Sequence, residues 1–206
     1  MSLPYGMAEA DTTGSVRFVP RRESHCRQRL QEAALSLYAE LGYANTTVAE
    51  VAVRAGVTER TYFRYFADKR EVVFADSGAL LGIVLEAVRS APQTAPVWEL
   101  IRLALQALAA DLEPRQERLR VRAQVIASTP ELLERDLAKQ ASWVGTLHGA
   151  IQARGTDPPQ AALAAAVAGA VFHVAYNAWL TEPDGRDLCG RLNETVVDTK
   201  HLVNSS

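Results

Sequence analysis

Cysteine is scarce in this chain of 206 residues, which holds only Cys26 and Cys189, far apart in the sequence. Their separation fits neither a disulfide framework nor the paired cysteines of a zinc site, so we expect a reducing environment and no bound metal. The N-terminus has no basic start followed by an apolar run, so we expect no secretion signal. Together these absences predict a cytoplasmic chain.

Sequence motifs that carry catalysis are also missing. The chain has no phosphate-cradling glycine loop, no G-x-S-x-G nucleophile elbow and no H-E-x-x-H metal pair. The neighbouring His25 and Cys26 lie in a segment that is predicted to be a long helix of the fold. We therefore expect that the protein is not an enzyme and uses no cofactor.

Long hydrophobic runs are almost absent. The most apolar stretch, Ala161–Leu180, approaches the ~20 residues that span a bilayer. It is mostly alanine and includes His173 and Asn177, so we expect a buried helix and no membrane partner. No segment alternates apolar and polar residues as a half-buried strand does, and the chain is therefore predicted to be all-α.

What the chain does have is helix-forming sequence between prolines. After residue 90, prolines separate segments rich in Ala, Leu, Glu, Arg and Gln, and proline is tolerated in the first turn of a helix but not in its interior. This pattern predicts a series of helices, several of which begin at a proline. Before residue 70, a helix is expected from about Arg22 to Leu41, with Gly42 placed to end it.

Two short helices are predicted next. The letters "TVAE" form a capping box in which Thr47 and Glu50 satisfy each other's backbone amides, so a helix begins there and closes at the glycine of "RAG". Thr58 is a good cap for a helix from about Glu59 to Phe66. Two helices joined by a short glycine turn, the second rich in arginine, form a helix-turn-helix pattern.

The same part of the chain is locally basic. Residues 17–70 carry ten arginines or lysines against six acidic residues, although the formal net charge of the whole chain is -2. A basic segment on a mildly acidic body is typical of a nucleic-acid-binding module attached to another domain, but a chance fluctuation can give the same balance.

A helical wheel of residues 59–66 separates two faces. Tyr62 and Phe66 point toward the preceding helix, and Phe63 lies at the border. The opposite face carries two arginines, a threonine and a tyrosine: Arg60, Thr61, Arg64 and Tyr65. Arginine can hold a guanine edge, threonine can touch a thymine methyl and tyrosine can donate to phosphate, so this face suits DNA. The alternative is an ordinary amphipathic helix with a solvated arginine face.

The segment "LQEAALSLYAELGYANTTVAEVAVRAGVTERTYFRYFADKREVVF", Leu30–Phe74, resembles the DNA-binding domain of TetR-family transcriptional regulators, which are dimeric all-helical repressors of bacteria. The likeness lies in the "AGV-x-x-x-T" turn, the aromatic recognition helix and the lysine that opens a fourth helix, which Asp68 can cap. The stretch "TERTYFRYFADKREVVF" is especially similar to a group of these regulators that is common in actinobacteria. The resemblance implies DNA contacts by seven residues: Thr47, Thr58, Arg60, Thr61, Arg64, Tyr65 and Lys69. Position 63 departs from the family pattern, which commonly has a phosphate-contacting tyrosine there.

The resemblance also implies a domain organisation. We expect a flexible arm at residues 1–21, a three-helix helix-turn-helix DNA-binding domain at 22–68, and a larger helical effector-binding and dimerisation domain at 69–206. The expected macromolecular partner is double-stranded DNA with a near-palindromic operator, and the expected function is that of a repressor released by a small apolar ligand.

A second copy of the chain is the other expected partner. One short recognition helix reads only a few base pairs, so useful specificity needs two half-sites and a twofold homodimer. The last two long helices, about Pro159–Leu180 and Gly185–Leu202, are predicted to build it. Leu188, Leu192 and Val196 offer an apolar stripe there.

Polar groups within apolar helices mark a candidate site for an unknown small-molecule effector. His173 and Asn177 are four residues apart and share a helix face. The candidate ligand-binding residues are Trp143, Leu147, Phe172, His173, Tyr176 and Asn177. The alternative is that these side chains only fill a core, and that the C-terminal domain dimerises but senses no ligand. The charged segments at 113–122 and 131–136 are expected to be solvated faces.

Overall fold

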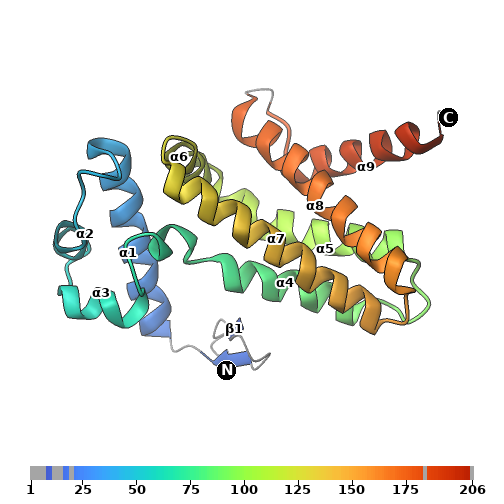
Figure 1. The fold of residues 1–206 in the computed structure, drawn as a ribbon, viewed down its shortest axis with the longest axis horizontal. Helices are drawn as coiled ribbons and strands as arrows, with labels where there is room; N and C mark the ends of the chain where they lie inside the picture. The colour runs from blue at the N-terminus through green and yellow to red at the C-terminus, as the bar shows by residue number, and fades with distance from the viewer. Residues whose placement is uncertain (1–7, 11–15, 19–20, 183–184, 205–206) are drawn as a thin grey trace, which may run out of the picture. The chain divides into compact units, whose positions relative to one another are not determined.

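The computed structural model describes residues 8–10, 16–18, 21–182 and 185–204. The chain divides into two compact units, one made of residues 1–82 with 117–136 and the other of residues 83–116 with 137–206. Both units are built mainly from helices (Figure 1).

The first unit contains the helix-turn-helix that the capping residues predicted. Its N-terminal elements are α1 (Arg21–Leu41), α2 (Val48–Arg54), α3 (Glu59–Tyr65) and the 3-10 helix η1 (Glu71–Phe74). Helix α1 ends at Gly42, whose φ of 85° is in the left-handed region that glycine adopts without strain. The amide of Gly42 donates to the Tyr38 carbonyl at 3.1 Å, which closes the last turn of α1.

Two downstream helices complete the core of the first unit. Leu30 and Leu37 of α1 and Val51 of α2 are buried in one apolar cluster with Tyr62 of α3 and with Phe66, which directly follows α3. The same cluster includes residues of α6 (Gln116–Ala127) and of the first turn of α7 (Pro130–Ala153): Val125, Ile126 and Leu132. The core of the first unit therefore includes residues that are remote in sequence. The segments of α6 and α7 that cover α1 lie about 90 residues after it in the chain.

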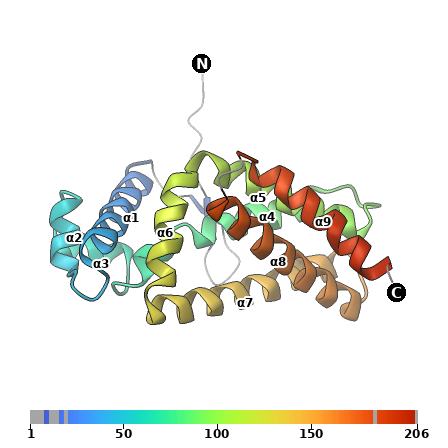
Figure 2. The same cartoon turned by 90° about the horizontal axis from the view of Figure 1, so that it is seen from above.

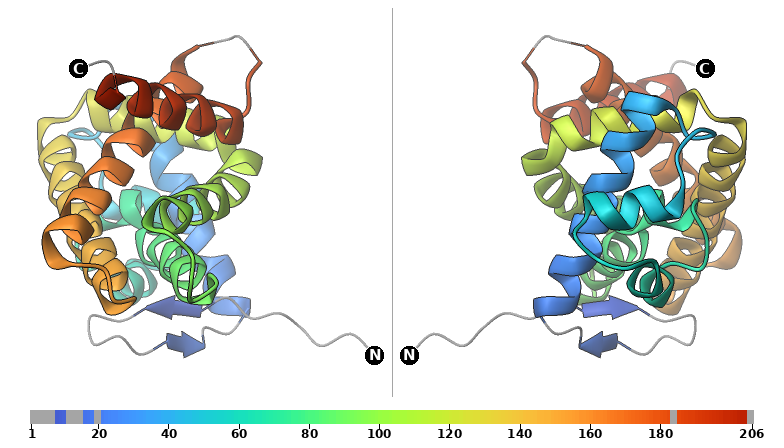
Figure 3. Two further views of the ribbon diagram at one scale, coloured as in Figure 1. Left: turned by 90° about the vertical axis from the view of Figure 1, so that its right-hand side faces the viewer. Right: turned by 90° about the vertical axis from the view of Figure 1, so that its left-hand side faces the viewer.

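Two short strands precede the helices. Strand β1 (Ala8–Ala10) pairs antiparallel with β2 (Val16–Phe18), with Ala8 opposite Phe18 (Figure 3). These strands leave the predicted all-α class unchanged, and the sequence did not indicate them because three residues are too few to display an alternating pattern. Much of the arm expected at 1–21 lies outside the described residues.

The second unit contains the long C-terminal helices. It comprises most of α4 (Ser77–Ser90), α5 (Val97–Leu112), the 3-10 helix η2 (Glu113–Arg115), most of α7, α8 (Pro158–Thr181) and α9 (Leu188–Asn204). Pro130 and Pro158 are the first residues of α7 and α8, as the proline pattern predicted. Helix α9 lies against both α8 and α5 (Figure 2).

Small residues let α8 pack closely against its neighbours. Its buried face is mainly alanine and also includes Trp179, which is 3% exposed. A Cβ at Gly169 would lie 2.9 Å from Cγ2 of Val144 in α7, so only glycine allows this approach of the two helices. By length and apolar composition alone, α8 is the described helix that could cross a membrane. It packs against α5 and α9, but only 33% of its apolar window is buried, so α8 is less buried than the sequence led us to expect.

The expected dimer stripe of α9 is wrong for two of its three residues. Leu188 and Leu192 are 0% and 2% exposed within a single copy of the chain, and Val196 is half-buried. Their period of four places them on the face that packs inside the second unit, because that face also has to cover an apolar core. They are therefore not available to a second copy.

Candidate nucleic-acid interface

The N-terminus of α2 is held by the predicted capping box. The Thr47 hydroxyl accepts from the Glu50 amide at 3.2 Å, and Glu50 Oε2 accepts from the Thr47 amide at 2.7 Å. The Thr47 hydroxyl also donates to Glu50 Oε2 at 2.8 Å, and the two hydrogen bonds to this carboxylate, led by the one from the Thr47 amide, hold the pKa of Glu50 below its usual value. Both residues are exposed, so the start of α2 is fixed and open to solvent.

The turn between α2 and α3 depends on Gly56. Its φ is 66°, and its amide donates to the Val53 carbonyl at 2.9 Å. Arg29 of α1 donates from Nη2 to the Ala55 carbonyl, and a Cβ at Gly56 would lie 2.8 Å from that same nitrogen. Glycine is thus favoured here by the backbone conformation, and a larger residue would also force the Arg29 guanidinium to shift.

Helix α3 is capped and docked as the sequence predicted. The Thr58 hydroxyl accepts from the Thr61 amide at 3.2 Å. Tyr62 and Phe66 are 0% and 3% exposed and belong to the core that also contains Val51. These two buried anchors, one helical turn apart, fix the rotation of α3 about its own axis.

The outward face of α3 differs from the helical wheel at three positions. Arg60, Phe63 and Arg64 are exposed, whereas Thr61 and Tyr65 are half-buried, and Tyr65 packs against the core. The placement of Phe63 at the border was therefore wrong, because its side chain is 54% exposed. A wheel gives angles within one helix, but burial on α3 also depends on where α1 lies beside it. We call Arg60, Phe63 and Arg64 the α3 face.

Arg64 is held by its neighbour on the α3 face. Its Nη2 donates to the Tyr65 hydroxyl at 3.0 Å, and its guanidinium carbon lies 4.9 Å from the centroid of the Tyr65 ring. An arginine stacked on an aromatic ring loses less side-chain entropy when it binds a planar acceptor. The half-buried Tyr65 thus orients the exposed arginine.

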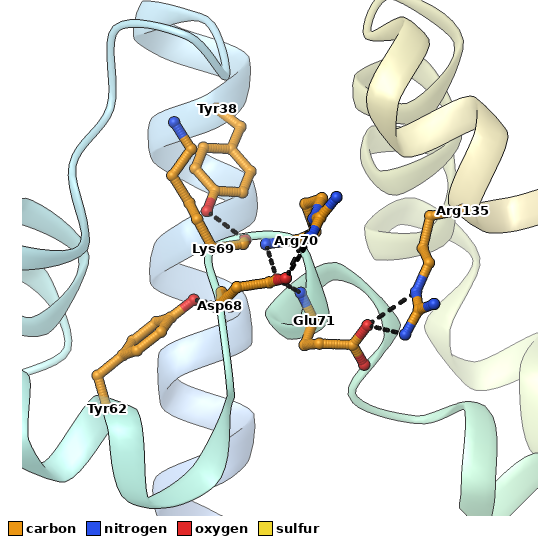
Figure 4. Close-up of polar contacts among 7 residues, drawn as sticks. All are labelled: Tyr38, Tyr62, Asp68, Lys69, Arg70, Glu71 and Arg135. Atoms are coloured by element: carbon orange, nitrogen blue, oxygen red, sulfur yellow. Dashed lines mark hydrogen bonds and ion pairs between the residues drawn. The ribbon is translucent and has the colours of Figure 1, made fainter.

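Two buried tyrosines, Tyr62 of α3 and Tyr38 of α1, hold the connection that follows α3 (Figure 4). The Tyr62 hydroxyl donates to the Asp68 carbonyl at 3.2 Å, and the Tyr38 hydroxyl donates to the Lys69 carbonyl at 2.9 Å. Asp68 Oδ1 accepts from the amides of Arg70 at 2.8 Å and Glu71 at 3.0 Å. Asp68 therefore satisfies two backbone amides at the start of the next element, but that element is the 3-10 helix η1 and its N-cap is Arg70, not Asp68 as predicted.

The Lys69 ammonium is directed at backbone carbonyls. Its Nζ donates to the carbonyls of Tyr43 at 2.5 Å and Thr46 at 2.8 Å and lies 4.0 Å from the centroid of the Tyr43 ring. Partial burial lowers the pKa of Lys69. No sequence pattern indicated these contacts, because the three residues are brought together only by the folding of the α1–α2 turn beside η1.

Arginines of α6 and α7 contact the segment that follows the helix-turn-helix. Arg118 pairs with Asp76 at 3.1 Å, Arg122 Nε donates to the Val73 carbonyl at 2.9 Å, and Arg135 pairs with Glu71 at 2.6 Å (Figure 4 shows the last pair). The expectation that the segments at 113–122 and 131–136 are solvated faces is wrong for Arg118 and Arg122, whose side chains are 19% exposed, whereas Arg135 is exposed. Their partners are more than 40 residues away in sequence, so no local spacing could indicate them.

The predicted ligand-binding residues lie in the second unit and form an aromatic stack. Ring centroids are separated by 6.4 Å between Trp143 and Phe172, by 5.1 Å between Phe172 and Tyr176, and by 5.9 Å between Tyr176 and Trp179. The stack joins α7 to α8, and Leu147 is buried one turn of α7 beyond Trp143. Aromatic packing thus accounts for most of the predicted set.

The two polar members of that set lie on the surface. His173 and Asn177 are exposed, with His173 Nε2 and Asn177 Nδ2 3.0 Å apart. The clearest hollows among the described residues, of about 340 and 290 Å³, are shallow depressions on α1 and α2, lined by residues such as Val53 and Arg54. Neither is lined by any of the six predicted ligand-binding residues.

Comparisons with known proteins match two consecutive parts of the chain. Residues 30–75 match the family described as bacterial regulatory proteins, tetR family, and residues 95–199 match the MftR C-terminal domain. The chain is 30% identical over 125 residues to a protein of Mycobacterium tuberculosis named as a mycofactocin biosynthesis transcriptional regulator, MftR, in a match that covers 61% of this chain and 63% of that protein. It is 36% identical over 92 residues to the HTH-type transcriptional regulator TcmR of Streptomyces glaucescens, covering 41% of this chain and 40% of TcmR. Each match spans less than two thirds of the relative's length.

Solved structures share the fold. The complex of SmeT with triclosan has a TM-score of 0.59 at 22% identity, covering 84% of this chain and 90% of SmeT, a repressor from Stenotrophomonas maltophilia. The regulator FadR from Bacillus subtilis, in complex with stearoyl-CoA, has a TM-score of 0.58 at 21% identity, covering 82% of this chain and 94% of FadR. Because residues 30–75 match the tetR family and the C-terminal family match covers half of the sequence, the chain belongs to the TetR family of bacterial transcriptional regulators.

Proposed function

We propose that the protein is a homodimeric repressor that binds a near-palindromic operator through α3 and is released by a small apolar ligand. The observation that carries the DNA-binding part is the α3 face, where two arginines are exposed on a short helix whose rotation is fixed by buried Tyr62 and Phe66. A fixed helix can insert one defined set of side chains into the major groove.

The proposed DNA contacts divide into two kinds. Arg60 and Arg64 can each hold the O6 and N7 acceptors of a guanine, which no other base presents in that arrangement. The remaining candidates, proposed to position the protein on the backbone or beside a base, are Thr47, Thr58, Thr61, Tyr65 and Lys69. Lys69 uses two of its three N–H groups on carbonyls of its own chain, so the third is the one proposed for phosphate.

An exposed apolar stripe on α8 supports the proposed dimer. Leu163 and Val174 are 66% and 57% exposed, and the exposed Ala166 and Ala170 lie between them at helical spacing. A face of this kind on a soluble chain is usually covered by a partner. A second copy is the proposed occupant, because two recognition helices are needed to read a near-palindrome.

Replacing Val174 with lysine is expected to convert the dimer to a monomer at micromolar concentration. In a twofold interface a single substitution places two unpaired charges against apolar surface, and the desolvation of each costs several kcal/mol. Sedimentation velocity gives the mass of each species. Val53→Lys, at a valine on α2 that is 77% exposed, is the matched control and is expected to leave the dimer intact. A dimeric Val174→Lys protein would contradict the proposed interface.

The aromatic stack supports the proposed effector site. Trp143, Phe172 and Tyr176 offer flat apolar surfaces, and His173 with Asn177 can supply a few oriented polar contacts beside them. A ligand that separates these rings would act on DNA binding only if it favours a conformation in which the two recognition helices no longer match successive major grooves, roughly 34 Å apart.

The test is a screen of apolar compounds by tryptophan fluorescence, followed by operator titration with and without each hit. An effector is expected to lower operator affinity by about 5- to 150-fold, and operator DNA must weaken effector binding by the same factor. Trp98→Phe, outside the stack, is expected to keep the signal, and Trp143→Phe is expected to lose most of it. Hits that quench tryptophan but leave operator affinity unchanged would contradict the proposed release.

One observation favours a second candidate function, a dimeric DNA-binding protein whose second unit senses no ligand. The clearest hollows among the described residues lie on α1 and α2 rather than along the aromatic stack. A broad screen without any fluorescence hit would select this alternative.

A further inference from the structure

Phe63 is an exposed aromatic side chain on the helix proposed to enter the DNA groove. Its side chain is 54% exposed, whereas the other aromatic residues of α3 are buried or half-buried. It lies three residues after Arg60 and directly before Arg64, so the three side chains share the outward side of α3. A large apolar group kept in water beside two cations is not explained by the packing of the first unit.

We propose that Phe63 is a specificity-determining residue that packs on the 5-methyl group of a thymine in the major groove. This inference rests on the proposed DNA-binding function. The thymine methyl is the apolar group that base pairs present in that groove, and a phenyl ring can contact it without leaving a hydrogen-bond donor or acceptor unpaired. Phe63 has no group that can bond to phosphate. Against a guanine or cytosine edge it would desolvate polar atoms without replacing their hydrogen bonds.

The Phe63 ring packs against the ring of Tyr62. The two ring centroids are 5.6 Å apart with an interplanar angle of 78°, an edge-to-face arrangement. Tyr62 is itself fully buried and donates to the Asp68 carbonyl at 3.2 Å. Phe63 therefore packs against a rigid side chain. We expect it to lose little side-chain conformational entropy when it contacts a methyl group.

The spacing of the α3 face predicts where the thymine lies. Three residues of α-helix rise about 4.5 Å, close to the separation of about 3.4 Å between successive bases of one strand. The thymine is therefore expected within about one base pair of a guanine contacted by Arg60 or Arg64. This places an apolar contact and a bidentate contact side by side in each half-site.

The experiment replaces thymine by deoxyuridine, which removes only the 5-methyl group. Duplexes are first selected from a random library by the purified full-length protein, and each thymine of the half-site is then substituted in turn. At one position, the wild-type protein is expected to lose about fourfold in affinity for one substituted half-site and about fifteenfold for both, the effect of one buried carbon group per contact. Phe63→Ala is expected to bind the thymine and deoxyuridine duplexes equally.

Two further variants keep the result interpretable. Phe63→Tyr retains the ring and is expected to retain the discrimination between thymine and deoxyuridine, and Phe63→Ser is expected to lose it as Phe63→Ala does. A wild-type protein that binds both duplexes equally at every position would overturn the inference, and so would an undiminished difference in Phe63→Ala. If the selection enriches no duplex, both the proposed function and this inference fail, whereas enrichment without deoxyuridine discrimination rejects the role of Phe63 alone.

Discussion

Replacing Arg64 with alanine is expected to reduce the binding free energy of a selected operator half-site by about 1–3 kcal/mol and to relax the base preference at one position. The side chain is exposed and is oriented by its hydrogen bond to the Tyr65 hydroxyl at 3.0 Å. Its loss removes a bidentate donor without affecting the core. Electrophoretic mobility shifts, combined with a second selection by the variant, measure both effects.

The Lys69→Met variant tests the proposed contact with phosphate. Unlike the contact of Arg64 with a base, this contact does not depend on the DNA sequence. The variant is expected to weaken all duplexes alike and to reduce the slope of log K against log salt by about 0.9, because one phosphate contact is lost. Its selected sequences should match those of the wild-type protein. If Arg64→Ala left both affinity and base preference unchanged, the assignment of the α3 face to the groove would be wrong.

Replacing Tyr62 with alanine is expected to lower the free energy of unfolding by about 3–5 kcal/mol. The ring is fully buried in the cluster that joins α1, α2 and α3, and its hydroxyl donates to the Asp68 carbonyl at 3.2 Å. The substitution therefore leaves a cavity and removes the tie between α3 and the connection to η1. Urea denaturation followed by circular dichroism measures the loss.

Two controls separate the contributions of Tyr62. Tyr62→Phe keeps the ring and removes the hydroxyl, so it is expected to cost about 1 kcal/mol, the usual net value of one hydrogen bond. Phe63→Ala, at the adjacent but exposed aromatic residue, is expected to change stability by about 0.5 kcal/mol at most. Equal losses for Tyr62→Ala and Phe63→Ala would show that burial does not distinguish the two positions.

Local sequence determined the boundaries of the helix-turn-helix. Thr47 and Thr58 cap α2 and α3, and Gly42 and Gly56 have positive φ at the ends of α1 and α2. Capping involves hydrogen bonds between residues three or four apart, and a positive φ is a property of one residue, so both can be predicted without knowing the rest of the fold. The resemblance of Leu30–Phe74 to the TetR family rests on the same local features.

Only the tertiary structure decided which side chains those helices present and what holds them in place. The exposure of Phe63 and the half-burial of Tyr65 depend on where α1 lies beside α3. Lys69 reaches the carbonyls of Tyr43 and Thr46 because the α1–α2 turn folds back beside η1.

The same holds for contacts between segments that are remote in the chain. The arginines of α6 and α7 bind the segment after α3, Leu188 and Leu192 face the core of their own copy, and His173 lies on the surface. Helical periodicity assigns these residues to a face of one helix but does not say which other helix covers that face. That choice is made by long-range packing, because the free energy of burying an apolar face depends on the helices that cover it, wherever they lie in the sequence.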